Sequence, residues 1–259
     1  MENFQTKFFQ NKDCKIKYLE GGTGQTLLFL HGGCVKASTY TNLLKQLSLN
    51  FHVIAPDLPC FGDSDVPESS WNYKEYAHFF LDFIKYLKAK NIVLIGHSLG
   101  GGIALHLTSI SPQIEFLILV NSSGIATKDK GNKIIYKFFF KRTFQDLLFY
   151  KDLRVFNLIA KDFFTSLIKK SKKVNQISKV VFNLLYADFS DFQKIKVPTL
   201  IIANKQDEIF TPEQIKKLKA KIPQAKLLEL TGNHTWCLYE SKKFNTMVID
   251  FVNKKGEIL

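Results

Sequence analysis

The sequence predicts an α/β fold, in which a mostly parallel central sheet is covered by helices on both faces and carries a helical insertion. Two observations lead to this fold class. Apolar runs that do not alternate with polar residues, such as 92–95, are typical of strands buried on both faces. These runs alternate along the chain with segments that place apolar residues at helical spacing. A length of 259 residues suits one large domain of this kind.

The N-terminal half of the chain begins with strands. We expect residues 6–10 and 15–20 to form an opening hairpin. Residues 26–33 and 50–57 are expected to be buried strands, because each is an apolar run that ends in glycine or proline. Residues 73–89 place apolar side chains at helical spacing and predict a helix before the strand at 92–95.

The C-terminal half continues the alternation of strands and helices. Residues 115–124 predict another buried strand. A strand at 197–207, a helix at 211–220, a strand at 225–230 and a closing helix at 241–254 complete the expected order. No internal repeat or low-complexity linker interrupts it.

The segment 124–190 breaks this rhythm, because it contains no clear buried strand. Its amphipathic stretches, 133–150 among them, predict helices. The segment falls between two expected strands, so we expect it to sit over the carboxyl edge of the sheet, where open α/β sheets bind ligands. The predicted organisation is a core of residues 1–123 and 191–259 with a helical cap, or lid, of residues 124–190.

The run IVLIGHSLGGG, residues 92–102, joins a strand pattern to a helix pattern through several glycines. A strand that turns abruptly into a helix needs unusual backbone angles, and glycines beside the corner avoid Cβ clashes. A G-x-S-x-G match arises by chance in about one chain in ten of this length. Its position between strand and helix makes it informative. We therefore expect Ser98 to be a strained, exposed nucleophile.

A serine hydroxyl needs a base to accept its proton, and the base needs an acid to orient it. Asp207 follows one predicted strand and His234 follows the next. Taken singly, Asp207 could cap a helix and His234 could be an ordinary loop histidine. Together with the turn at Ser98 they predict a nucleophile, an acid and a base.

The developing negative charge of an acyl-transfer reaction needs hydrogen-bond donors. The backbone amide of Leu99, directly after the serine, is one candidate. The loop that ends the strand at 26–33 offers a second donor, the amide of Gly33. A tight turn is the alternative explanation of the glycines in that loop.

Five motifs in order resemble the α/β-hydrolase superfamily, with the nearest likeness to capped serine esterases: HGG at 31–33, DLPCFGDSD at 57–65, GHSLGG at 96–101, NKQDEIFTP at 204–212 and GNHTWCLYE at 232–240. The resemblance implies that Ser98, Asp207 and His234 form a catalytic triad. It also implies that the Gly33 and Leu99 amides form the oxyanion hole. The fold hosts many chemistries, so it does not identify a substrate.

Three positions depart from the pattern of that superfamily. Cys60 and Asn204 stand where glycine is frequent, and Cys34 stands where proline is common. None of the three is a triad residue, so the departures concern the shape of the pocket. A serine at position 98 excludes the members of the superfamily that use an aspartate nucleophile.

Composition restricts the partners and the cell compartment. The net charge of +13 comes almost entirely from lysine, whereas nucleic-acid readers favour arginine, so we expect no nucleic-acid partner. The four cysteines are scattered and the histidines show no ligand spacing, so we expect no metal, no cofactor and no disulfide scaffold. No apolar run is long enough to cross a bilayer and no signal peptide is visible, which predicts a cytoplasmic protein.

The positive charge is concentrated in the predicted cap. Residues 124–190 hold 14 Lys or Arg against 5 Asp, which is +9 of the formal +13. A solvated lysine surface is the first interpretation. Contact with an anionic membrane surface is the second, because lysines and bulky apolar residues are interleaved. Steering of acidic substrates is the third.

The function predicted from these residues is hydrolysis of carboxylic esters through an acyl-enzyme. Ten of the 24 phenylalanines lie in 124–190, and we expect some of them to form a pocket for small to medium hydrophobic acyl groups. The alternatives are a hydrolase of carbon–carbon bonds in diketone-like substrates, a small-peptide aminopeptidase and a non-catalytic receptor of the same fold. An aminopeptidase is disfavoured because 124–190 contains no glutamate to hold a free amine.

Overall fold

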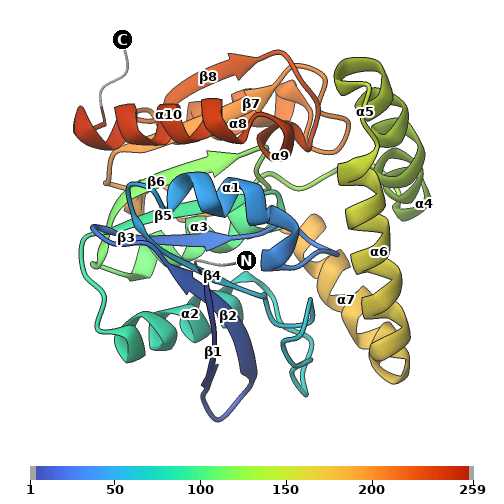
Figure 1. Ribbon diagram of the computed structural model, residues 1–259, viewed down its shortest axis with the longest axis horizontal. Helices are drawn as coiled ribbons and strands as arrows, with labels where there is room; N and C mark the ends of the chain where they lie inside the picture. Colours follow the sequence, from blue (N-terminus) through green and yellow to red (C-terminus); the bar gives the residue numbers. More distant parts are fainter. Residues whose placement is uncertain (1–3, 257–259) are drawn as a thin grey trace.

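A single eight-stranded sheet forms the centre of the protein, as shown in Figure 1. The computed structural model describes residues 4–256, apart from the side chains of Ile135, Phe138 and Phe139. The strands are β1 (Gln5–Gln10), β2 (Lys15–Gly21), β3 (Thr26–Leu30), β4 (His52–Pro56), β5 (Ile92–His97), β6 (Ile114–Val120), β7 (Thr199–Asn204) and β8 (Lys226–Leu230).

The strand order in the sheet is β1-β2-β4-β3-β5-β6-β7-β8. β1 pairs antiparallel with β2, and β2 pairs antiparallel with β4. Every pair from β4 to β8 is parallel. The expected hairpin and the mostly parallel sheet are therefore confirmed. Parallel strands joined by helices bring all their carboxyl ends to one edge, and the loops at that edge carry the candidate site.

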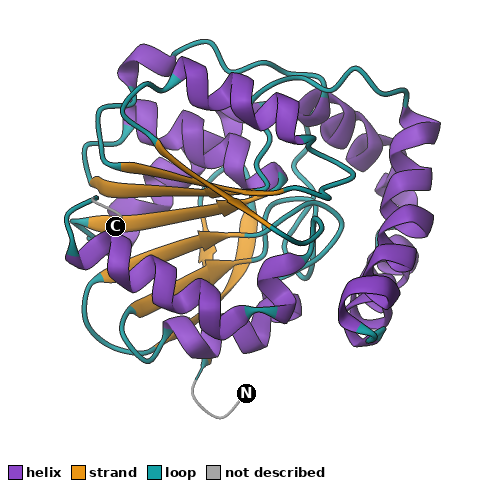
Figure 2. Cartoon of the chain, turned by 90° about the horizontal axis from the view of Figure 1, so that it is seen from above, coloured by secondary structure: helices purple, strands orange, loops and turns teal. Residues whose placement is uncertain are grey.

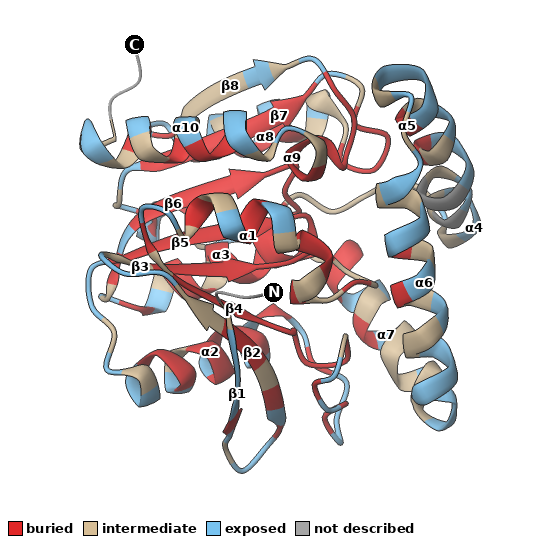
Figure 3. Ribbon diagram, viewed as in Figure 1, coloured by how far each residue is buried: buried red, intermediate tan, exposed pale blue. Residues whose placement is uncertain are grey.

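Helices cover both faces of the sheet (Figure 2). One hydrophobic core contains the buried sides of α2, α3 and α8, and the other contains those of α1 and α10. The buried strands lie between the two cores, which Figure 3 shows as the buried centre of the molecule. The helices outside 124–190 are α1 (Thr41–Leu47), α2 (Tyr73–Leu87), α3 (Leu99–Ile110), α8 (Pro212–Lys221), α9 (Trp236–Tyr239) and α10 (Ser241–Asn253).

Helix α2 illustrates how local sequence defines an element. Asn72 caps its N-terminus by accepting a hydrogen bond from the amide of Lys74, and Lys88 ends it in the left-handed conformation. Phe80 and Phe83 are fully buried against the sheet. Complete burial of such a side chain contributes about 1.5–3 kcal/mol. The capping signals and the apolar face therefore agree on the same helix.

Residues 124–190 form four α-helices, α4 (Gly131–Tyr136), α5 (Arg142–Tyr150), α6 (Arg154–Lys169) and α7 (Val174–Leu185), with a short 3-10 helix, Ser171–Lys173, before α7. A π-helical turn, Lys137–Lys141, makes α4 and α5 one continuous helical run. In Figure 1 these helices form a group beside the sheet layers. The group is tied to the core where the Tyr73 hydroxyl donates to the backbone oxygen of Leu184 at 2.8 Å and where Lys36 pairs with the buried Asp162 at 3.2 Å. Within residues 4–256, no helix combines the length and the apolar character needed to cross a membrane.

Candidate active site

Ser98 occupies the sharp turn between β5 and α3. Its φ of 55° and ψ of −123° lie in a region that non-glycine residues rarely adopt, as expected for a strained turn. The glycines after it are explained by close approach: a Cβ on Gly100 would lie 2.2 Å from the backbone oxygen of Leu30, and one on Gly101 would lie 1.9 Å from Ser122 Oγ. The turn can therefore form only if positions 100 and 101 carry no side chain.

Ser98 is more enclosed than its sequence context suggests. Only 7% of the residue is exposed, so the expectation of an exposed serine is wrong. Neighbouring segments outside 124–190 enclose it: a Cβ on Gly32 would lie 3.1 Å from Ser98 Cβ, and His234 Nε2 lies 3.0 Å from Ser98 Oγ. These segments are distant in the sequence, so the pattern at the turn does not reveal them.

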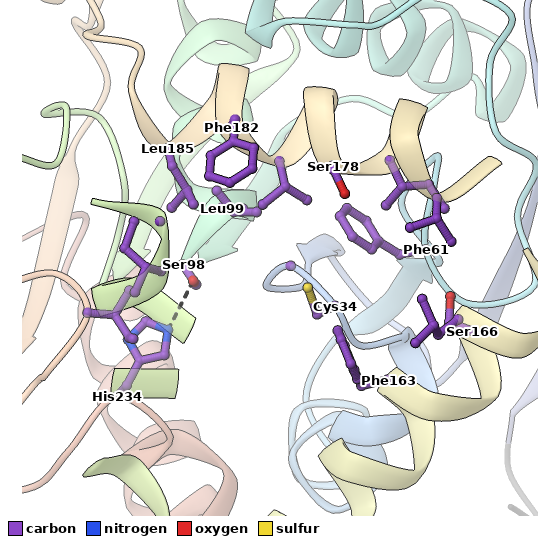
Figure 4. A pocket seen from close by; sticks show the side chains of 18 residues that line it. Cys34, Phe61, Ser98, Leu99, Phe163, Ser166, Ser178, Phe182, Leu185 and His234 are labelled. Carbon is purple, nitrogen blue, oxygen red and sulfur yellow. Dashed lines mark hydrogen bonds between the residues drawn. The ribbon is translucent and has the colours of Figure 1, made fainter. Parts of the chain in front are cut away.

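The structure brings the three predicted triad residues together. His234 Nε2 lies 3.0 Å from Ser98 Oγ, and His234 Nδ1 lies 2.9 Å from Asp207 Oδ2 (Figure 4 for the first contact). The second oxygen of Asp207 accepts hydrogen bonds from the amides of Ile209 and Phe210, at 2.7 and 3.0 Å. One oxygen of Asp207 therefore binds the turn that follows it, and the other lies within hydrogen-bond distance of His234. The role of Asp207 as the acid of the triad stays a prediction.

The electrostatic environment favours a neutral histidine. Burial lowers the pKa of His234 to about 4. With Asp207 accepting a hydrogen bond from Nδ1–H, the neutral ring leaves the Nε2 lone pair free to accept the proton of Ser98. The arrangement can therefore transfer the serine proton to the histidine.

Core residues that we did not predict hold the backbone of His234. Its carbonyl oxygen accepts hydrogen bonds from Asn121 Nδ2 and His97 Nε2, both at 3.0 Å. Its amide donates to Glu208 Oε2 at 3.4 Å. Asn121 directly follows β6, and a polar residue at the carboxyl end of a buried strand is the one signal that could have identified it. The sequence offers no separate signal for Glu208, because it directly follows Asp207 in a loop that already contains the predicted acid.

A cavity of about 320 Å³ opens onto Ser98 and His234 (Figure 4). Gly33 and Leu99, the predicted oxyanion residues, also line it. They lie against each other, because a Cβ on Gly33 would be 2.4 Å from Leu99 Cδ1. Both predicted donors are therefore at the cavity wall beside Ser98, and the use of their amides as an oxyanion hole stays a prediction.

The other wall of the cavity comes from helices α4, α6 and α7 of the segment 124–190. Its residues there are Gly131, Ile134, Phe163, Ser166, Leu167, Val174, Ile177, Ser178, Val181, Phe182 and Leu185. None of the described residues that line the cavity is Asp, Glu, Lys or Arg. The cavity therefore suits an uncharged, apolar group.

The cavity also contains a thiol, that of Cys34. Cys34 lines the cavity, but burial raises the pKa of its thiol to about 11, so it is protonated at neutral pH. Within residues 4–256, no three His, Cys, Asp or Glu side chains gather closely enough to hold a metal ion. Ser98 is therefore the cavity residue with a hydrogen-bonded base beside it.

The family model of the alpha/beta hydrolase fold matches residues 25–241. An uncharacterized protein of Mycobacterium tuberculosis is 37% identical over 109 residues, a match that spans 42% of this chain and only 32% of that protein. Lipase 1 of Psychrobacter immobilis is 28% identical over 237 residues, covering 83% of this chain and 73% of the lipase. The solved structure of an esterase from Exiguobacterium antarcticum superposes with a TM-score of 0.77 at 23% identity, over 96% of this chain and 100% of the esterase. The chain belongs to the alpha/beta hydrolase fold family.

Proposed function

We propose that this α/β hydrolase is a serine hydrolase that cleaves carboxylic esters of small to medium hydrophobic acyl groups. The observation that carries the proposal is the hydrogen-bonded series Ser98–His234–Asp207 at the wall of an apolar cavity. The similarity to Lipase 1 of Psychrobacter immobilis supports an ester substrate.

In the proposed reaction, His234 Nε2 takes the proton of Ser98 Oγ as the oxygen attacks the ester carbonyl carbon. The amides of Gly33 and Leu99 donate hydrogen bonds to the resulting oxyanion. The C–O bond to the alcohol breaks, and the alcohol leaves with the proton from His234. A water molecule then gives its proton to His234 and attacks the acyl-enzyme, which releases the acid and restores Ser98.

The apolar lining supports an ester over the other reactions considered. A small-peptide aminopeptidase needs a carboxylate to hold the free amine, and none of the described lining residues is acidic. A diketone-like substrate that carries a carboxylate would likewise meet no counter-charge there. A neutral ester with a hydrophobic acyl group matches the lining without such a partner.

A fluorophosphonate label and a panel of p-nitrophenyl esters test the proposal. We expect Ser98 to be labelled and the preferred acyl chain to be longer than acetate. Ser98→Ala is the control for both measurements. If the protein is labelled at Ser98 but cleaves only diketones, it is a hydrolase of carbon–carbon bonds and not an esterase. If it is neither labelled nor active on any of these substrates, the result supports a non-catalytic receptor.

The cap also presents a surface that we propose contacts anionic lipid. Seven large hydrophobic side chains on the helical run 131–150 and on α6 are more than half exposed; we call them the cap face: Tyr136, Phe140, Phe144, Leu147, Leu148, Phe164 and Ile168. Figure 3 shows exposed segments on both helices. Exposed aromatic and aliphatic residues interleaved with lysines are typical of helices that lie on anionic membranes.

One residue of the cap face adjoins a residue of the cavity wall in the sequence. Leu167 and Phe182 line the cavity and are also 40% and 43% exposed. Leu167 directly precedes Ile168 of the cap face on α6. An apolar acyl chain would therefore find apolar side chains both outside and inside the entrance.

A further inference from the structure

Asp146, on cap helix α5, contacts the loop that carries His234. The residue is fully buried. Its Oδ1 accepts a hydrogen bond from Asn233 Nδ2 at 2.6 Å and another from Thr235 Oγ1 at 2.9 Å. Asn233 and Thr235 directly precede and follow His234, so one carboxylate oxygen accepts hydrogen bonds from the loop on both sides of the histidine.

Polar neighbours offset part of the effect of burial on Asp146. Burial is the largest influence and raises the pKa of the Asp146 carboxyl above its usual value, while hydrogen bonds from Asn233 and Thr235 and the nearby charge of Arg142 act in the opposite direction. Arg142 lies one turn earlier on α5, is also fully buried, and interacts electrostatically with Glu208 as well. The case for Asp146 rests on its two hydrogen bonds to the loop.

The backbone of His234 and the side chains of its two neighbours are held by different parts of the protein. Asn121, His97 and Glu208 of the core hold the backbone of His234 itself. The side chains on either side of it are held by Asp146 of the cap. Removing Asp146 would therefore free the loop on the cap side while the core contacts remain.

We propose that Asp146 is a positioning residue, which acts through Asn233 and Thr235 to keep His234 Nε2 within hydrogen-bond distance of Ser98 Oγ. Helix α5 is then part of the catalytic apparatus as well as part of the cap. Movement of the cap helix would move the histidine loop with it. The inference rests on the proposed function, because it assigns Asp146 to the reaction of Ser98.

The rate at which a fluorophosphonate labels Ser98 tests this role without depending on the substrate. Asp146→Ala removes the acceptor, and we expect labelling and kcat for a butyrate ester to fall about 10- to 100-fold. KM should change less than about threefold, because Asp146 does not line the cavity. Asp146→Asn keeps an accepting oxygen and should recover part of the rate. Asp152→Ala, at a cap carboxylate paired with Arg154, is the matched control and should label like wild type.

Thr235→Val keeps the test valid if Asp146→Ala does not fold, because it removes one donor to Asp146 with little change of shape. In the double variant the two losses should not add, since both act on one contact. Labelling at the wild-type rate in folded Asp146→Ala and Thr235→Val would overturn the inference. A wild type that labels without hydrolysing esters would overturn only the proposed substrate, and a wild type that does neither would overturn both proposals.

Discussion

At Ser98 the protein keeps a non-glycine residue in a backbone conformation that favours glycine, and the surrounding glycines make room for it. Such strain persists only where the neighbouring structure fixes it. Here β5, α3 and the close approach of Leu30 to Gly100 fix the turn. The serine hydroxyl is thereby held toward His234 and the cavity.

We predict the effect of replacing Ser98, His234 or Asp207. Ser98→Ala and His234→Ala should each lower kcat for ester hydrolysis by several orders of magnitude, and Asp207→Asn should also be severe because it disturbs the histidine tautomer. The losses should not add, because the three residues act as a unit. Steady-state kinetics with circular dichroism as a folding control provide the measurement. If Ser98→Ala kept more than about a tenth of wild-type turnover, another nucleophile would be at work.

The protonation of His234 predicts a pH profile. Only neutral His234 can accept the serine proton, and burial lowers its pKa below the usual 6.5. The neutral form therefore persists to lower pH, and activity is lost only as the pH falls through the lowered pKa. We expect the acid limb of kcat/KM to have its midpoint below pH 6.5, measured by titration of the released acid. A midpoint at or above 6.5 contradicts this environment for the histidine.

Among the elements, the expected strands and long helices are present, and their ends differ from expectation by a few residues. The strand expected at 26–33 ends at Leu30, because the following residues turn toward the cavity. We did not predict α1, Thr41–Leu47, although Leu43, Leu44 and Leu47 are buried at helical spacing. A helix of seven residues is too short for its periodicity to stand out.

Two positions on helix α7 supply a test of the acyl pocket. Val181 lines the cavity, whereas Asn183 on the same helix is exposed. Val181→Phe should reduce the space for long chains and lower kcat/KM for octanoate about tenfold relative to butyrate, a change of about 1.4 kcal/mol. Asn183→Phe adds the same ring on the exposed side and should leave the ratio unchanged. An unaltered ratio in Val181→Phe would show that acyl chains bind elsewhere.

The phenylalanines of 124–190 divide between several environments. Phe163 and Phe182 line the cavity, and Phe189 is buried in the core. Phe140 and Phe144 belong to the exposed cap face. Phe138 and Phe139 have side chains outside the described part of the structure. Composition predicted that some of the ten phenylalanines would line an apolar pocket, and the fold determines which ones do.

Over the whole molecule, the proposed lipid contact predicts binding to vesicles. We expect co-sedimentation with phosphatidylglycerol vesicles at low salt, weaker binding at moderate salt and little binding to phosphatidylcholine, because lysines supply the long-range attraction. Phe144→Ser with Ile168→Ser should reduce binding, since both side chains are among the most exposed, at 67% and 75%. Leu49→Ser is the matched control, because Leu49 is apolar and 71% exposed but lies outside the segment 124–190. Absence of binding to either vesicle type would favour an ordinary solvated lysine surface.

The fold class, the order of the main elements and the tight turn at Ser98 follow from the amino-acid sequence alone. These features depend on residues close together in the chain: apolar runs, helical spacing and glycines beside one serine. The motif order also led to Asp207 and His234, which the structure places in hydrogen-bond contact with each other and with Ser98. The catalytic roles of these residues stay predictions until variants are measured.

The surroundings of that series become visible only in the folded protein. Asp146 and Asn233 are 87 positions apart, and no local pattern links them. The same holds for Asn121 and for the residues of 124–190 that line the cavity. A buried polar contact or a cavity wall forms where distant segments happen to pack, so its members carry no spacing that a single sequence reveals. Periodicity specifies which side of an element is buried, and packing alone specifies what it is buried against.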